Sequence, residues 1–181
     1  LAVLSNTVST FKEGIELMKK NIENGEALKQ LNNYVKMSNK FSKEGFLDRI
    51  MNRKKVNLSI KMQYSPIDEI DSTFQPLNCY QILSGNNTKI IGEIKRSSPS
   101  EGNINSDINI NEVVTDYING SVTGISILTE NVWFGGSLKD IKSVRNQIEN
   151  IPNRPFILRK DFIFSRYQVF EAYIAGADTL L

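Results

Sequence analysis

Hydrophobic and polar residues follow two different patterns along this chain, and the change comes near Lys89. Before it, apolar residues recur every three or four positions, which is the period of an amphipathic helix. After it, short apolar runs alternate with helical patterns, which predicts strands and helices in turn. The sequence therefore predicts a helical first part and an α/β second part.

The first part opens with two predicted helices. Thr10 and Glu13 fit a capping box at the start of the first helix, and Gly25 is well placed to end it in a left-handed conformation. A second helix is predicted over about 28–38. The polar, aperiodic residues 41–45 are typical of a linker.

A third helix is predicted from Phe46 to Met62. One side of it carries Leu47, Ile50, Met51, Lys54 and Leu58. The segment from Pro66 to Pro76 is irregular, and a short apolar piece, Cys79–Leu83, precedes a turn at Gly85.

The second part repeats the order strand, loop, helix three times and then begins a fourth strand. The predicted strands are Lys89–Lys95, Val122–Leu128, Pro155–Arg159 and a last one from Asp178, and the predicted helices cover about 110–119, 137–148 and 165–175. This alternation is typical of a parallel sheet, either closed into a barrel or doubly wound. No GxGxxG follows the first strand, which disfavours a dinucleotide-binding sheet. The complete strands lead through charged residues into loops, where a (β/α)₈ barrel has its active site.

Composition narrows the chemistry that this chain can perform. The 181 residues carry 22 Lys and Arg against 20 Asp and Glu, a net charge of +2, with no His and one Cys. This near balance argues against binding to nucleic acids or membrane surfaces by bulk charge. The missing His and the single Cys79 disfavour His-dependent catalysis, zinc and iron–sulfur sites and intramolecular disulfides. Acid–base chemistry would fall to Lys, Asp, Glu, Ser, Tyr or Arg.

Glu93 and Lys95 lie two positions apart at the end of the first predicted strand. Because side chains alternate across a strand, both point to the same side, which in a barrel is the interior mouth. Opposite charges at such a position need partners or a ligand. Two interpretations stay open: a functional pair, or a Glu–Lys pair that neutralises itself within the barrel.

Further charged candidates follow the other strands. Lys160 and Asp161 come after the third strand, where a functional pair and an exposed strand-end pair are both consistent with the sequence. Glu130 follows the second strand, and we expect it to be a solvated loop carboxylate. Their positions in the sequence alone do not decide whether these charged side chains take part in catalysis or are simply exposed to solvent.

The loops also contain hydroxyl and aromatic candidates. Ser98 and Ser100, with Gly102, could offer hydroxyls and amides to an anion, or could simply form a turn. Phe134 and Phe162 could line an aromatic ligand or pack in the core.

Three segments together resemble indole-3-glycerol-phosphate synthase. They are GEIKRSSPSEG at 92–102, ILTE with FGGSL over 127–138, and LRKDFI at 158–163. The E-I-K-x-x-S-P-S-x-G and L-R-K-D-F runs are highly specific in this order and spacing. The resemblance covers roughly Phe46 to Leu181, and the helix Phe46–Met62 resembles the extra helix that covers this family's barrel. It implies a (β/α)₈ TIM barrel, here truncated within strand four and preceded by extra helices.

The resemblance also implies a reaction in tryptophan biosynthesis. In it, 1-(2-carboxyphenylamino)-1-deoxyribulose 5-phosphate closes its ring, loses CO₂ and water, and gives indole-3-glycerol phosphate. The implied partner is this small phosphorylated substrate, without a metal or organic cofactor, nucleic acid or membrane. The implied location is the cytoplasm or an organelle.

The motifs carry site roles with them. By resemblance, Lys160 is the general acid for ring closure, Lys95 pairs with anionic groups of the substrate and takes part in dehydration, and Glu93 orients the lysines or shuttles protons. Ser98 and Ser100 line the substrate site, and Phe134 and Phe162 pack on the anthranilate ring.

Residues 1–40 lie outside that resemblance. Within them, Phe11–Leu17 and Ile22–Leu31 resemble C-terminal helices of anthranilate phosphoribosyltransferase. We therefore expect part of a fused bifunctional protein. Its parts are the tail of one enzyme at 1–40, a linker at 41–45 and the front of the next enzyme at 46–181.

A complete barrel needs about 250 residues, and this chain stops within the fourth predicted strand. We expect the family's second-half residues, a later glutamate and a Gly/Ser phosphate cup, to be missing, and strand edges to be unpaired. The sequence predicts little or no synthase activity for these 181 residues alone. Two alternatives stay open: a non-catalytic barrel remnant or interaction module, and another phosphate-binding barrel such as phosphoribosylanthranilate isomerase. The isomerase relies on a Cys/Asp pair, whereas Cys79 precedes the first strand.

Overall fold

The structure, a computed structural model, describes Lys20, Glu23, Gly25, Lys29 and the ranges 45–67 and 74–181. It divides into two compact units, 1–68 and 69–181, which we describe separately. Most of the first two predicted helices and of the linker falls outside the described residues, but Lys20, Glu23 and Lys29 are helical. Gly25 has a φ of +80°, the left-handed conformation predicted for the residue that ends the first helix.

The first unit contains helix α3, Phe46–Tyr64, close to the predicted Phe46–Met62. Asp48 in its first turn and Lys61 in its last turn have the signs that favour the helix dipole. Ile50 is 1% exposed, but Leu47, predicted on the same side, is 55% exposed. Within the described ranges, no helix combines the length and the apolar character needed to cross a membrane.

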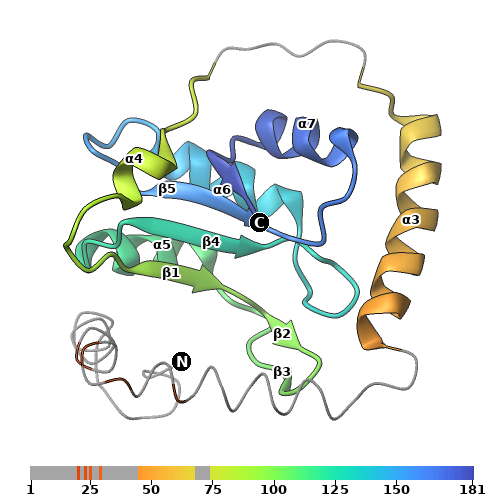
Figure 1. The fold of residues 1–181 in the computed structure, drawn as a ribbon, viewed down its shortest axis with the longest axis horizontal. Helices are drawn as coiled ribbons and strands as arrows, with labels where there is room; N and C mark the ends of the chain where they lie inside the picture. The colour runs from red at the N-terminus through yellow and green to blue at the C-terminus, as the bar shows by residue number, and fades with distance from the viewer. Residues whose placement is uncertain (1–19, 21–22, 24, 26–28, 30–44, 68–73) are drawn as a thin grey trace. The chain divides into compact units, whose positions relative to one another are not determined.

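The second unit is an α/β fold with a four-stranded parallel sheet, which confirms the fold class at this level. The strands are β1 (Ile91–Ile94), β4 (Gly124–Leu128), β5 (Phe156–Lys160) and β6 (Thr179–Leu180), in the order β1-β4-β5-β6. The connecting helices are α5 (Ile110–Asn119), α6 (Leu138–Ile148) and α7 (Arg166–Ala175). In Figure 1, α5 and α6 lie behind the strands, so the viewer looks at the opposite face of the sheet.

The register of the sheet decides which side chains share a face. Glu93 pairs with Ser126 and Ser126 with Leu158, while Leu128 pairs with Lys160. Registered partners in parallel strands point to the same side, so these residues lie on the face away from the helices. The alternate positions are buried with the helices and form the core: Ile94, Ile125, Ile127, Ile157, Val114, Ile141, Val144 and Ile148.

Local signals fix where the connecting helices begin and end. The Ser137 side chain caps α6, and Ser165 forms a capping box with Gln168 at the start of α7. Gly176 ends α7 with a φ of +94°, and a Cβ there would lie 2.8 Å from Arg145 Cγ. A side chain at this position would be both strained and crowded. The ends of α6 and α7 lie close to the predicted ranges, 137–148 and 165–175.

Three details differ from the predictions. The loop after β1 contains an antiparallel hairpin, β2 (Ser97–Ser98) and β3 (Gly102–Asn103), where the sequence predicts only a turn-rich loop. The first predicted strand, Lys89–Lys95, is shorter in the structure, and Ile91 is 37% exposed because it shares with Glu93 the face of the sheet away from the helices. Finally, β5 extends through Lys160, which therefore belongs to the sheet and not to the following loop.

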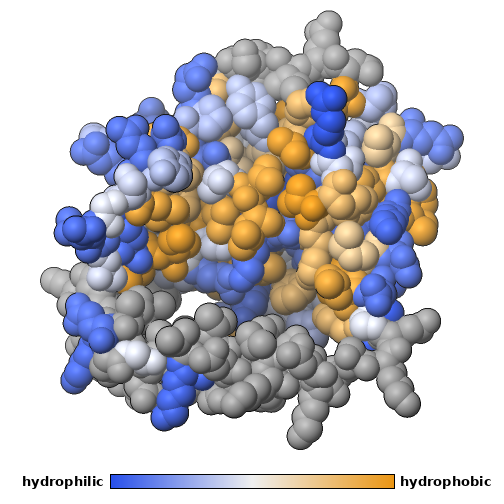
Figure 2. Space-filling model, viewed as in Figure 1, coloured by the Kyte–Doolittle hydropathy of each residue, from blue (hydrophilic) through white to orange (hydrophobic). Residues whose placement is uncertain are grey.

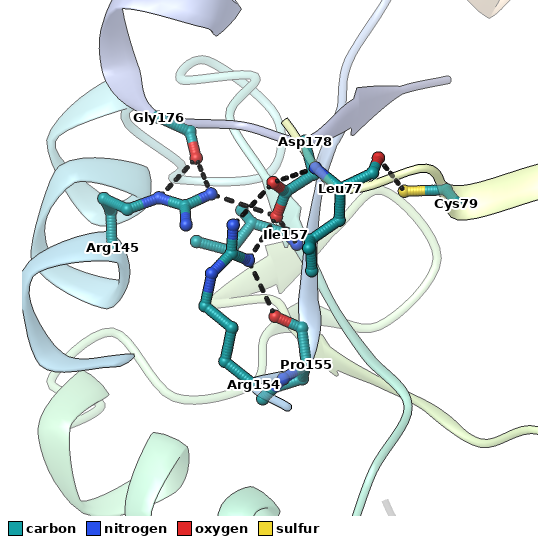
Figure 3. A network of polar contacts seen from close by, with 8 residues as sticks. All are labelled: Leu77, Cys79, Arg145, Arg154, Pro155, Ile157, Gly176 and Asp178. Atoms are coloured by element: carbon teal, nitrogen blue, oxygen red, sulfur yellow. Dashed lines mark hydrogen bonds and ion pairs between the residues drawn. The ribbon is translucent and has the colours of Figure 1, made fainter. Parts of the chain in front are cut away.

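A buried network surrounds Asp178 at the amino ends of β5 and β6 (Figure 3). The Asp178 carboxylate accepts hydrogen bonds from Arg154 at 2.7 and 2.9 Å, from Arg145 at 3.0 Å, and from the backbone N–H groups of Leu77 and Ile157. Burial raises the pKa of Asp178, but these hydrogen bonds and the charge of Arg145 outweigh it and bring the pKa below its ordinary value. Arg145 belongs to α6 and Ile157 to β5, whereas Leu77 and Arg154 come from irregular segments beside them.

The segment that contains Phe74 precedes the sheet and is held at the amino ends of β5 and β6. The Phe74 and Tyr173 rings lie 5.2 Å apart, and the Tyr173 hydroxyl donates to the Phe74 carbonyl. The Arg145 guanidinium lies 4.6 Å from the centre of the Phe74 ring. Helix α4, Cys79–Leu83, follows as the predicted apolar piece, and burial together with the charge of Asp178 raises the pKa of the Cys79 thiol.

Candidate active site at the carboxyl ends of the strands

Lys160 and Glu93 meet across the sheet. Lys160 ends β5 and Glu93 lies on β1, with β4 between these strands. The Lys160 Nζ nevertheless donates to Glu93 Oε2 at 2.6 Å. The intervening β4 leaves room for this contact because the small Ser126 stands level with Glu93. The pair is open to solvent, with 42% of the Lys160 side chain and 32% of the Glu93 side chain exposed.

Lys95 joins this cluster from the end of β1. Its Nζ lies 3.9 Å from Glu93 Oε1 and 3.7 Å from Glu101 Oε2. The prediction that Glu93 and Lys95 share one side is confirmed. They do not form an isolated neutral pair, because Glu93 has a closer partner in Lys160. Glu93 thus has an ammonium group at each of its two oxygens.

Ser98 and Ser100 lie in the hairpin beside Lys95. Ser98 is 6% exposed, and its Oγ lies 3.3 Å from Ser100 Oγ. The same Oγ accepts the Glu101 backbone N–H at 3.1 Å and donates to Glu101 Oε2 at 3.3 Å. The structure therefore connects both predicted serines with Lys95 through Glu101.

Phe134 and Phe162 come together from two different loops. Phe134 follows β4 and Phe162 follows β5, and their ring centres lie 6.3 Å apart with the planes tilted by 41°. The Ser97 hydroxyl donates to the Trp133 carbonyl at 2.9 Å, and the Ser97 N–H donates to the Phe134 carbonyl at 3.3 Å. The aromatic pair is thus tied to the loop that follows β1.

Glu130 is not the solvated carboxylate that the sequence predicts. It is 1% exposed, and its carboxylate accepts the backbone N–H groups of Val132, Trp133 and Phe134. The prediction is wrong because a tightly folded loop leaves amides without backbone partners, and this carboxylate supplies the acceptors. Glu130 therefore shapes the loop that carries Phe134.

Asp161 is also buried, which rules out the exposed strand-end pair for this residue. Its side chain is 1% exposed and accepts hydrogen bonds from Arg159 at 3.0 Å, the Thr129 hydroxyl at 2.7 Å and the Phe162 N–H at 2.8 Å. Neighbouring residues on β5 point to opposite faces, so Arg159 and Lys160 lead to different surroundings. Asp161 anchors the loop that carries Phe162.

Further contacts hold β1 in place. Arg96 forms a two-point ion pair with Asp140 in the first turn of α6, at 2.5 and 3.0 Å. The Tyr117 hydroxyl of α5 donates to the Glu93 carbonyl at 2.7 Å. Burial, with the added charge of Glu93, raises the pKa of Tyr117 to about 12, so this phenol stays a hydrogen-bond donor. The backbone that carries Glu93 is fixed from the helix side.

Glu101 and Ser126 also belong to this region, although neither is among the site residues predicted from the sequence. Glu101 stands within the quoted S-P-S-E-G run, and its charge beside two serines could have drawn attention to it. Ser126 is 4% exposed, and its Oγ has no hydrogen-bond partner in the described part of the chain. Nothing in the local sequence reveals that Ser126 stands beside Glu93, because only the strand register brings them together.

Chemically, the cluster offers two ammonium groups that can donate protons or bind anions, and a carboxylate that can accept a proton or orient them. Two hydroxyls and an aromatic pair lie in the adjoining loops. Among the described residues, no group of three or more His, Cys, Asp or Glu side chains could hold a metal ion.

Comparison with known proteins gives the family of this fold and site. Residues 47–181 match the family model of indole-3-glycerol phosphate synthase. The indole-3-glycerol phosphate synthase of Bacteroides thetaiotaomicron is 34% identical over 139 residues, which cover 75% of this chain and 52% of that protein.

Multifunctional tryptophan biosynthesis proteins are also similar to this chain. The protein of Pichia angusta is 46% identical over 101 residues, covering 56% of this chain and 28% of that protein. The protein of Schizosaccharomyces pombe is 33% identical over 187 residues, covering 98% of this chain and 25% of that protein. The chain thus spans about a quarter of the length of these relatives. Since the family model matches most of its length, the chain belongs to the indole-3-glycerol phosphate synthase family.

Proposed function

We propose that this chain supplies the first half of an active site that makes indole-3-glycerol phosphate in tryptophan biosynthesis. The observation that carries the proposal is the Lys160–Glu93–Lys95 cluster, which lies at the carboxyl ends of parallel strands beside the Phe134–Phe162 pair. In (β/α)₈ barrels this end of the strands holds the catalytic groups. The substrate is 1-(2-carboxyphenylamino)-1-deoxyribulose 5-phosphate.

The reaction needs an acid, cations and a means of removing water. The ring carbon that bears the carboxylate attacks the ketone carbon of the sugar chain, and the ketone oxygen takes a proton to become a hydroxyl. The bond to the carboxylate then breaks, CO₂ leaves, and the electron pair restores the aromatic ring. The hydroxyl finally leaves as water, taking up one proton while the neighbouring CH₂ loses another, which completes the indole.

The cluster can divide these tasks among its members. Lys160 donates the proton to the ketone oxygen, and Lys95 binds an anionic group of the substrate and assists in the loss of water. Glu93 holds both ammonium groups and accepts or returns protons, in keeping with a contact to each. The partial exposure of the Lys160 side chain, 42%, leaves it accessible to a ligand.

The loops supply the remaining contacts in this proposal. Ser98 and Ser100 donate hydrogen bonds to the substrate, and Phe134 and Phe162 pack against its aromatic ring. The two rings come from separate loops, with centres 6.3 Å apart and planes tilted by 41°, and together they offer an apolar surface to that ring.

We also propose that the four-stranded sheet is one part of a closed (β/α)₈ barrel. In Figure 2, hydrophobic side chains gather at the surface over the sheet, on the face that α5 and α6 leave open in Figure 1. In the described ranges, β1 and β6 each pair on one side only. An apolar face and unpaired edges favour further strands that complete the structure. The 181 residues alone are then expected to turn over little or no substrate.

An upstream fused enzyme is the last part of this proposal. Residues 1–40 resemble the C-terminal helices of anthranilate phosphoribosyltransferase, and the match to the Schizosaccharomyces pombe multifunctional protein covers 98% of this chain. Sequencing the source gene upstream of Leu1 tests the fusion. A reading frame that encodes a phosphoribosyltransferase supports it, and any other upstream enzyme overturns this assignment.

The experiment for the activity completes the barrel. This chain is produced together with the part of the Bacteroides thetaiotaomicron synthase that lies beyond its match, and turnover is followed by the fluorescence of the indole product. We expect turnover with both parts and little or none with either part alone. A chain that is active by itself contradicts the predicted inactivity, and a completed barrel without any turnover favours a non-catalytic remnant.

Lys160→Ala tests the proposed acid in the same completed barrel. A positioned acid contributes about 10²–10⁴ in rate, so we expect a loss of that size with unchanged folding. Lys139→Ala removes an exposed lysine of α6 and serves as the matched control, with turnover expected at the unsubstituted rate. Full activity in Lys160→Ala would remove Lys160 from the mechanism.

A further inference from the structure

Glu101 lies where an anion that approaches Lys95 would arrive. Its Oε2 is 3.7 Å from Lys95 Nζ and 3.3 Å from Ser98 Oγ. One cation and one hydroxyl therefore converge on a single carboxylate oxygen of the protein itself. An ammonium group beside a hydroxyl donor is also the arrangement that binds a carboxylate or phosphate oxygen of a ligand.

The charges of the cluster balance only because Glu101 is present. Two ammonium groups, Lys95 and Lys160, stand against two carboxylates, Glu93 and Glu101. An anionic ligand that enters beside Glu101 gives the cluster an excess of negative charge. A ligand that replaces the Glu101 carboxylate keeps the balance, which makes exchange the favoured route.

Glu101 is held loosely enough to be exchanged. Its side chain is 49% exposed, and the distance of 3.7 Å to Lys95 is longer than a direct hydrogen bond. Exposed ion pairs of this kind contribute little to stability. Next to Glu101, Gly102 has a φ of +67°, and a Cβ built there would meet no atom within 4 Å, so the turn stands clear of its surroundings.

We propose that Glu101 acts as an internal stand-in for the ligand's oxyanion, occupying the place between Lys95 and Ser98 until a carboxylate or phosphate group displaces it. This inference rests on the proposed function, because it takes Lys95 as the cation that binds the substrate. Glu101 then sets the affinity of the site for anions: it competes with the ligand and keeps the lysine neutralised while the site is empty.

The test measures oxyanion binding to the full 181-residue chain and its variants. Anthranilate, followed by its fluorescence, probes a carboxylate, and inorganic phosphate, followed by calorimetry, probes the other oxyanion. We expect Glu101→Gln to lower the dissociation constant for at least one probe by about two- to fivefold, the range expected when a partly exposed ion pair is lost. The probe that responds identifies the group that displaces Glu101.

Two further variants separate this inference from the proposed function. Glu149→Gln makes the same change in net charge at the exposed end of α6, and we expect it to leave binding unchanged. Lys95→Met should weaken binding and should abolish the gain from Glu101→Gln when the two are combined. Thermal unfolding of each variant confirms that it is folded.

The outcomes are distinct. If Glu101→Gln binds both oxyanions no more tightly than the unsubstituted chain while Lys95→Met weakens binding, the role of Glu101 is overturned and the proposed function stands. If Lys95→Met leaves binding unchanged, or if no probe binds, the proposed anion site at Lys95 fails and the inference fails with it. An equal gain in Glu149→Gln shows a general charge effect and also overturns the role of Glu101.

Discussion

The two ends of the parallel sheet use the same kinds of charged residues in opposite ways. At the amino ends, Asp178 is held by Arg145 and Arg154, with side-chain exposures of 0% for the acid and 10% for each arginine. At the carboxyl ends, Glu93 is held by Lys95 and Lys160, with exposures of 32%, 21% and 42%. One acid between two cations is therefore a buried anchor at one end and an open cluster at the other.

The difference lies in how completely the groups are satisfied. Asp178 accepts two backbone N–H groups in addition to its arginines, which leaves it no capacity for a ligand (Figure 3). At the open end, Lys95 lies 3.9 and 3.7 Å from its two acidic partners, too far for direct hydrogen bonds, so its donors remain available. Closed networks stabilise a fold, whereas loosely held charges can exchange partners with a ligand.

Asp178→Asn should destabilise the fold most. The change leaves Arg145 and Arg154 buried without their counter-charge, and breaking a buried ion pair in this way costs about 3–5 kcal/mol. Urea unfolding measures the difference, with Asp107→Asn as the exposed control of the same chemistry. A loss below about 1 kcal/mol would show that the closed network is not the anchor that its geometry indicates.

Acid should weaken the same anchor. The pKa of Asp178 lies below its ordinary value of 3.8, so the stabilisation is fully present above pH 3.8 and is lost as the pH falls through the lower, folded value. The difference in the free energy of unfolding between the unsubstituted chain and Asp178→Asn should therefore narrow only in strong acid. Unfolding curves at a series of pH values measure it, and a gap that closes near neutral pH would contradict the assignment.

Ser126→Ala should stabilise the sheet. Ser126 is 4% exposed and its hydroxyl has no partner in the described part of the chain, and an unsatisfied buried group costs about 1–3 kcal/mol. We expect a gain of about 1 kcal/mol after the loss of packing is included. Ser97→Ala removes a hydroxyl that donates to the Trp133 carbonyl at 2.9 Å, so we expect this change to lower the stability. A loss of stability in Ser126→Ala would mean that this hydroxyl has a stabilising partner.

Glu93→Gln should change stability least and activity strongly. The side chains of Glu93, Lys95 and Lys160 are all partly exposed, so their ion pairs contribute less than about 1 kcal/mol to the stability of the fold. In the completed barrel, loss of the carboxylate that orients Lys160 should reduce turnover by about 10²-fold or more. Thermal unfolding and turnover, measured on the same samples, separate the two effects. A large loss of stability would make the open end a structural network like that of Asp178.

Much of the fold could be predicted from residues close together in sequence. The helix predicted over 137–148 matches α6, Leu138–Ile148, whose residues Ile141, Val144 and Ile148 are 0% exposed. The helix predicted over 165–175 matches α7, Arg166–Ala175, which Ser165 caps and Gly176 ends with a left-handed backbone. These signals are local, because a cap or a helical face depends on residues within a few positions of one another.

The surroundings of the charged residues could not be predicted in the same way. The sequence placed Glu130 in solvent and allowed Asp161 an exposed position, but both carboxylates are buried against loop amides. Periodicity does not reveal which amides a loop leaves without partners. The hairpin that brings Glu101 to Lys95 was missed for the same reason, since its contacts depend on the path of the loop.

Residues close together in the sequence were enough to predict the alternation of strands and helices, the common side of Glu93 and Lys95, and the motifs that indicate the family. The folded sheet was needed to show that Lys160 reaches Glu93 across β4, and that Ser126 stands level with Glu93 on that strand. The physical reason is that side-chain direction follows from the local geometry of a strand. Distances between strands depend instead on sheet order and register, which residues far apart in the sequence fix together.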